Sequence, residues 1–137
     1  MDYRVDCGDA AVGILTDTGF VPEPAAAALT GVDLLVLESN HDVEWLRSGP
    51  YPYSLKQRIL GQRGHLSNED AAAFARRMAE CGTRCIVLAH LSRENNTPQR
   101  ALAVMETALS GLDVTVEVAP RGELSACYGA EVALCRK

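Results

Sequence analysis

The stretch Val32-Asp33-Leu34-Leu35-Val36-Leu37-Glu38-Ser39-Asn40-His41-Asp42 decides the fold of this chain. Residues 32–37 are apolar except for Asp33, which is typical of a strand that is covered on both faces. The run ends abruptly in polar residues at Glu38. Two other short apolar segments, 11–16 and 85–89, have the same character and predict further buried strands.

The segments between these strands carry helix signals. Ser67 begins one of them, because its hydroxyl can accept from the Asp70 amide while the acids of this turn favour the positive end of the helix. The expected helices are 24–29, 42–47, 54–60, 67–82 and 97–109, and the expected later strands are 113–118 and, with a weaker pattern, 130–134. Strands that alternate with helices predict an α/β fold with a largely parallel sheet. We expect one domain over residues 1–137.

The composition excludes several classes of protein. With 47% hydrophobic and 23% charged residues the chain is too apolar to be disordered. Its longest apolar run, of about six residues, is far shorter than the ~20 needed to span a bilayer. No export signal is visible at the start, and the five cysteines are an odd number. We therefore expect a cytoplasmic protein with no membrane contact and with reduced, chemically silent thiols.

The charge is unevenly distributed along the chain. The net charge is −5, but residues 45–68 contain no acid and carry four bases: Arg47, Lys56, Arg58 and Arg63. The same segment holds three aromatic residues: Trp45, Tyr51 and Tyr53. One interpretation is a solvated loop with some packed rings. The other is a local patch that meets a phosphate backbone, because positive charge supplies affinity and flat rings supply contact area.

Polar residues that can bind a metal follow each apolar strand. Asp17 follows the first, Glu38 and His41 follow the second, and His90 follows the third. Because the carboxyl ends of parallel strands share one edge of a sheet, Asp17, Glu38 and His90 are expected at the same rim. His65 lies just before the Ser67 helix start, a place suited to anions.

Each of these residues also has a purely structural interpretation. Asp17 could cap a turn, Glu38 could be a surface acid, and His65, His90 and His41 could be hydrogen-bonded residues at element ends. Taken together they favour a site in which Asp17 and His90 share a metal and Glu38 pairs with His65. Carboxylate and imidazole ligands suit Zn²⁺ or Mn²⁺. Two ligands are too few for a complete catalytic metal site.

Four ordered motifs resemble those of metallo-β-lactamase-fold hydrolases: Thr16-Asp17-Thr18-Gly19, Leu37-Glu38-Ser39-Asn40-His41-Asp42, Gly64-His65-Leu66-Ser67-Asn68-Glu69-Asp70-Ala71 and Leu88-Ala89-His90-Leu91-Ser92. The stretch 51–60 and Asn95-Asn96 narrow the resemblance to the YycJ/WalJ-like branch, which is related to the tRNA 3′-processing and β-CASP nucleases. The resemblance covers nearly the whole chain.

The chain departs from this family in one large respect. The His-x-His-x-Asp-His motif of the family's first half, and a further histidine, are not present. The resemblance therefore implies the C-terminal half of an αββα sandwich: a mixed sheet with helices on one face. The missing N-terminal half, or a self-association partner, would cover the other face.

The resemblance assigns a role to several residues. It makes Asp17 the carboxylate that bridges two divalent metal ions (Zn or Mn) and His90 the final ligand of the second. Glu38 and His65 resemble the catalytic pair that assists departure of the leaving group at a scissile phosphate. His41 receives no role from it.

Four further residues are expected to bind the substrate. Ser67 and Ser92 would donate to phosphate oxygens, and Arg58 and Arg63 would contact DNA. The implied activity is that of a DNA exonuclease acting 5′ to 3′, with His65 protonating the departing oxygen.

Two alternatives stay open. The substrate could be a non-nucleic-acid ester or thioester, or the chain could be an inert half-domain or interaction module. Because it has at most two of the family's metal ligands, the chain alone is expected to bind Zn²⁺ or Mn²⁺ weakly and to be inactive. An uncovered sheet face would drive association.

Overall fold

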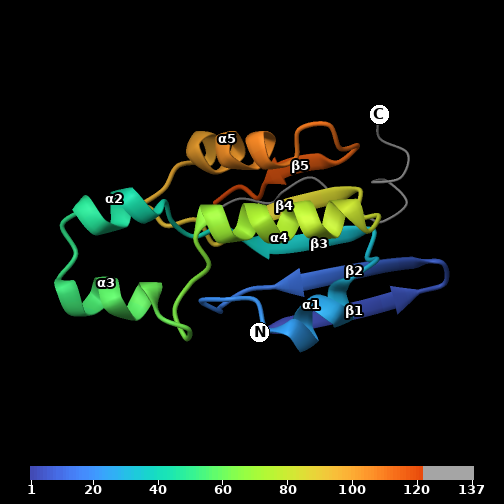
Figure 1. Cartoon of the computed structure of the whole chain (residues 1–137), viewed down its shortest axis with the longest axis horizontal. Coiled ribbons are helices and arrows are strands. Elements are labelled where there is room, and N and C mark those ends of the chain that lie inside the picture. Colours follow the sequence, from blue (N-terminus) through green and yellow to red (C-terminus); the bar gives the residue numbers. More distant parts are fainter. Residues whose placement is uncertain (122–137) are drawn as a thin grey trace.

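The structure, a computed structural model, describes residues 1–121 (Figure 1). Its strands are β1 (Asp2–Cys7), β2 (Ala10–Leu15), β3 (Leu34–Glu38), β4 (Cys85–Ala89) and β5 (Thr115–Val118). Its helices are α1 (Glu23–Leu29), α2 (Val43–Ser48), α3 (Tyr53–Leu60), α4 (Asn68–Glu80) and α5 (Pro98–Ala108). The strand expected over 130–134 lies outside the described residues.

The five strands form one mixed sheet in the order β1-β2-β3-β4-β5. β1 is antiparallel to β2, and all other neighbours are parallel. Register brings the carboxyl ends together, because Leu15 pairs with Leu37 and Glu38 pairs with Ala89. The loops that follow β2, β3 and β4 therefore start at one edge of the sheet, as the sequence predicted.

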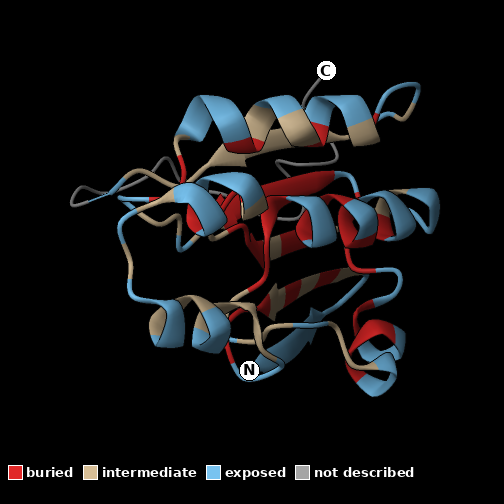
Figure 2. Cartoon of the chain, turned by 60° about the vertical axis from the view of Figure 1, so that its left-hand side comes forward, coloured by how far each residue is buried: buried red, intermediate tan, exposed pale blue. Residues whose placement is uncertain are grey.

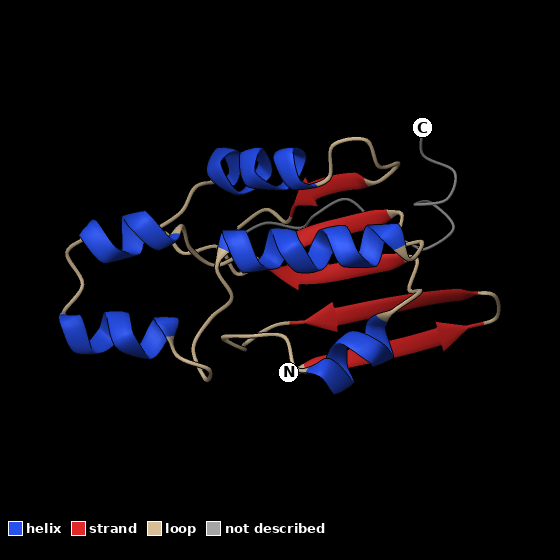
Figure 3. Ribbon diagram, viewed as in Figure 1, coloured by secondary structure: helices blue, strands red, loops and turns tan. Residues whose placement is uncertain are grey.

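Helices α1, α4 and α5 lie on one face of the sheet (Figure 3). The sides that they turn to the strands are buried (Figure 2). Alternate strand residues such as Leu15, Leu35 and Ile86 enter the core on this face and pack with helix residues such as Phe74 and Met105. This arrangement confirms the predicted fold class, a mixed α/β sheet with helices on one face.

β1 is an element that the sequence analysis missed. All its residues are exposed, so it lacks the apolar run that marks the other strands. The Arg4 guanidinium attaches β1 to α1 by donating 2.9 Å hydrogen bonds to the carbonyls of Ala28 and Thr30. β1 therefore adds an antiparallel edge to a sheet that was expected to be largely parallel.

The opposite face of the sheet is apolar and carries none of the described helices. Tyr3 and Val5 point to this face, because they pair with Ile14 and Val12. They are 56% and 60% exposed. Val36 continues the same face on β3.

Helices α2 and α3 lie away from these layers, beyond the carboxyl ends of the parallel strands (Figure 1). Leu46 anchors α2 in the interior, whereas α3 has no buried residue. The two helices thus stand beside the rim where the candidate site residues gather. Among the described residues, no helix is both long and apolar enough to cross a membrane.

Candidate active site

Glu38 lies at the centre of the site. It ends β3 and is fully buried, although it is a carboxylic acid. Its Oε2 accepts a 2.9 Å hydrogen bond from the Leu66 amide, which attaches the start of the α4 segment to the end of β3. A buried acid needs such partners, because an unpaired buried charge is strongly unfavourable.

Two histidines supply further partners for this carboxylate. His65 Nδ1 lies 3.2 and 3.3 Å from its two oxygens, and His90 Nδ1 lies 3.2 Å from Oε1. A carboxylate only accepts hydrogen bonds, so each Nδ1 carries the proton that it shares with Glu38. Nε2 is then the nitrogen of each ring that is left for another partner.

Asp17 and His90 have a strained backbone. Their φ angles are +57° and +58°, and they are the two non-glycine residues with positive φ within 1–121. Such conformations cost energy and cluster at functional sites. His90 Nδ1 lies 3.8 Å from Asp17 Oδ1, and the Asp17 amide approaches Glu38 Oε1 at 3.4 Å. The turns after β2 and β4 thus direct both residues to Glu38.

Asp17, Glu38 and His90 could hold a metal ion. Each offers a ligand atom, and the three atoms lie within 4.8 Å of one another. This donor set fits Zn²⁺ or Mn²⁺. Glu38 already accepts from Leu66 and both imidazoles, so Asp17 and His90 have the freer ligand atoms.

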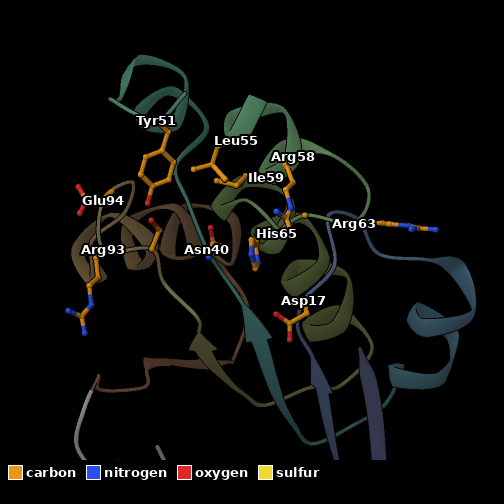
Figure 4. Close-up of a pocket in the computed structure, with 12 residues that line it drawn as sticks. Asp17, Asn40, Tyr51, Leu55, Arg58, Ile59, Arg63, His65, Arg93 and Glu94 are labelled. Atoms are coloured by element: carbon orange, nitrogen blue, oxygen red, sulfur yellow. The ribbon is translucent and has the colours of Figure 1, made fainter. Parts of the chain in front are cut away.

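A cavity of about 610 Å³ opens beside these residues (Figure 4). Its lining combines site residues with residues of the 45–68 segment: Asp17, Asn40, Tyr51, Leu55, Arg58, Ile59, Arg63, Gly64, His65, Ser92, Arg93 and Glu94. In Figure 4 His65 lies between Asp17 and the side chains of α3, whereas the Arg63 side chain extends away. The basic segment therefore forms a wall of the same cavity that the candidate catalytic residues face.

The two serines expected to bind phosphate have different positions. Ser92 lines the cavity. Ser67 is buried and does not line it; its hydroxyl accepts from the Asp70 amide at 3.1 Å and caps α4. The predicted cap is confirmed: the Ser67 oxygen accepts at this helix end.

His41 lies behind the site and does not line the cavity. It is 1% exposed, its Nδ1 lies 3.2 Å from Asn40 Oδ1, and its Nε2 is buried without a partner. Burial and, to a smaller extent, the nearby His65 lower the pKa of this imidazole to about 4 against the opposing effect of Asp70 and Asp42. His41 is therefore neutral at neutral pH.

The sequence analysis gave Asn40 no role, yet it connects three loops of the site. Its side-chain amide donates to the His90 carbonyl at 2.8 Å, and its backbone bonds to Leu66 and Ser92 at 2.9 and 2.7 Å. Hydrogen bonds among Ser39, Asn68 and Asn96 lie buried beneath it.

These four polar residues all lie within the sequence stretches that resemble the family. That position was the signal by which sequence analysis could have identified them. Their partners, however, come from distant parts of the chain.

Comparisons with known proteins agree with this geometry. No protein-family model matches the chain. The exodeoxyribonuclease WalJ of Streptococcus pneumoniae (serotype 2, strain D39) is 45% identical over 116 residues, which are 85% of this chain and 43% of that protein. The exodeoxyribonuclease YycJ of Bacillus anthracis is 43% identical over 101 residues, 74% of this chain and 38% of that protein. The chain thus spans less than half the length of these curated relatives.

A solved structure supports the fold independently. The metallo-β-lactamase fold protein YhfI from Bacillus subtilis superposes with a TM-score of 0.59 at 20% identity, over 88% of this chain and 41% of that one. At this identity the similarity concerns the fold alone. Together with the two relatives it confirms the resemblance drawn from the motifs: the chain belongs to the YycJ/WalJ-like branch of the metallo-β-lactamase-fold hydrolases.

Proposed function

We propose that this chain is part of a metal-dependent phosphodiesterase that removes nucleotides from a DNA end. The observation that carries the proposal is Glu38, a buried carboxylate that holds His65 and His90 beside Asp17 at the mouth of an arginine-lined cavity. The two curated relatives are named exodeoxyribonucleases, which supports DNA as the substrate. The cytoplasm is the proposed compartment, in which exposed thiols such as those of Cys7 and Cys81 would stay reduced.

His65 is the proposed general acid. Its Nδ1 faces Glu38, so the carboxylate stabilises the ring when it is doubly protonated and Nε2–H can donate to the departing oxygen. Arg58 would neutralise phosphate charge in the same cavity. Divalent ions, Zn²⁺ or Mn²⁺, held by Asp17 and His90 together with further ligands would polarise the phosphate.

The remaining metal ligands are proposed to come from a second αβ half. The exposed apolar side chains of Tyr3 and Val5, on the sheet face that carries none of the described helices, are suited to such a partner, because exposed apolar surface favours association. The relatives are more than twice as long as their matched region, which leaves enough chain for a second layer pair. This half would complete both the sandwich and the site.

Metal binding by the 137-residue chain tests whether the remaining metal ligands come from a second half. We expect Zn²⁺ or Mn²⁺ to bind only weakly, with affinity reduced by Asp17→Ala or His90→Ala and DNA hydrolysis negligible. Asp113→Ala, a change of an exposed acid remote from the rim, is the control. A competition titration with a chelating dye measures the affinity. Sub-micromolar zinc binding by the chain alone would show a complete ligand set and contradict the need for a second half.

DNA binding tests the substrate class. Arg58→Ala and Arg63→Ala are each expected to weaken binding and to reduce the slope of log K against log salt by about 1. Arg77→Ala is the matched control, since this arginine pairs with Glu23 on the helix face, away from the cavity. Fluorescence anisotropy over a salt series measures the slope. Unchanged binding in both cavity variants would favour the ester or thioester alternative.

A further inference from the structure

We propose that Tyr51, Leu55 and Ile59 form a nucleobase subsite that takes the terminal base of a DNA strand. The inference rests on the proposed phosphodiesterase function and deepens it. It specifies where the base lies while the phosphate is held near Arg58 and His65.

The three aromatic residues of the 45–68 segment have different surroundings. The guanidinium of Arg100 lies 5.0 Å from the centroid of the Trp45 ring, so that ring already has a partner. Tyr53 is 77% exposed and does not line the cavity. Tyr51 lines the cavity and projects into it (Figure 4). Of these aromatic rings, Tyr51 is the one that a bound ligand could reach together with the catalytic groups.

Helix α3 supplies the apolar part of the same wall. Leu55 and Ile59 are one helical turn apart and so lie on one face of α3, which contributes no buried residue to the core. Both side chains line the cavity. An apolar helix face that is not used by the core is suited to contact with a ligand of low polarity, such as the flat face of a base.

The charges in the cavity favour a DNA end that is bound with its phosphate near Arg58 and its base near Tyr51. Arg58 and His65 lie on the side of Asp17, whereas Arg93 and Glu94 are adjacent at the other end and leave it without net charge. The guanidinium of Arg58 can pair with a phosphate at the first end, where Asp17 carries the opposite charge, and a neutral base fits the second. The cavity volume of about 610 Å³ is within the roughly 300–1,000 Å³ typical of small-ligand sites.

The test uses two short 5′-phosphorylated single strands, one ending in 2-aminopurine and the other in an abasic residue. We expect Tyr51→Ala to weaken binding of the first strand by about 5- to 100-fold, the range of base stacking on an aromatic ring. Binding of the abasic strand changes little. Tyr51→Phe keeps the ring and is expected to bind both strands as the unmodified chain does. Tyr53→Ala is the exposed-ring control and should also leave binding unchanged.

The outcomes separate this subsite from the proposed function. If Tyr51→Ala weakens both strands equally, or neither, while Arg58→Ala weakens both, the subsite is wrong and phosphodiester binding stands. If the unmodified chain binds neither strand, both proposals are wrong. Tyr51→Leu guards against misfolding, because it retains apolar volume: it should fold, and it should lose the preference for the strand that ends in a base.

Discussion

Replacing Glu38 with alanine is expected to lower the free energy of unfolding by about 2–4 kcal/mol. The buried Leu66 amide loses its 2.9 Å acceptor, and an unsatisfied buried donor costs about 1–3 kcal/mol. The vacated side-chain volume adds a cavity cost. His65 and His90 also lose the group that fixes their rings. Urea unfolding, followed by the fluorescence of Trp45, measures the change.

Glu38→Gln separates charge from volume. Glutamine fills the same space and can still accept from Leu66, so most of the stability should be retained. Its NH₂ group cannot accept from an imidazole, so His65 and His90 cannot both keep their present hydrogen bonds. Because such outer partners orient metal-binding histidines, zinc affinity should fall by about 10- to 100-fold.

A surface acid provides the control for these variants. Glu44 is exposed, and its Oε1 lies 3.7 Å from Arg47 Nη1. An exposed ion pair of this kind contributes about 0–1 kcal/mol to the free energy of unfolding. Glu44→Ala should therefore unfold near the same urea concentration as the unmodified chain. The central position of Glu38 would be contradicted if Glu38→Ala were as stable as Glu44→Ala and bound zinc equally well.

The sequence predicted the convergence of the site because it depends on strand order and polarity. Three apolar runs that alternate with helices predict parallel strands whose carboxyl ends meet, and register then places Asp17, Glu38 and His90 together. These features are local in the sequence and follow from burial. The pairing of Glu38 with His65 was also predicted from the residues, before the family resemblance gave the pair a role, and the 3.2 Å distance between His65 Nδ1 and Glu38 Oε1 supports it.

The sequence could not reveal how loop side chains are directed. The contact of His90 with Glu38 requires a left-handed backbone at residue 90, and no local residue pattern there specifies it. By sequence Ser67 could cap a helix or contact a ligand, and the structure shows that it is buried and that its oxygen accepts from the Asp70 amide at the cap. β1 was missed because its stability comes from pairing with β2 and from the contacts of Arg4.

Acidification is expected to destabilise the fold through His41. The ordinary pKa of histidine is about 6.5, and burial lowers the pKa of His41 in the folded chain to about 4. The unfolded chain therefore takes up the proton first as the pH falls. Stability from this residue is fully present above about pH 6.5 and is lost progressively down to about pH 4, with a total near 3 kcal/mol.

Hydrogen bonding explains why the folded state rejects this proton. Asn40 donates its amide to the His90 carbonyl, so its Oδ1 must accept from His41 Nδ1–H. A second proton would sit on Nε2, which is buried and has no partner. Protonation of His41 thus adds an unsatisfied buried donor and a charge near His65.

His41→Gln measures this contribution directly. Glutamine can donate to Asn40 but does not titrate, so its free energy of unfolding should fall less steeply between about pH 6.5 and about pH 4. The difference between the two pH profiles isolates His41, since all carboxylates are common to both proteins. Urea unfolding at each pH gives the values. Parallel profiles would mean that His41 takes up its proton equally in the folded and unfolded chains, and hence that water reaches Nε2 behind the site.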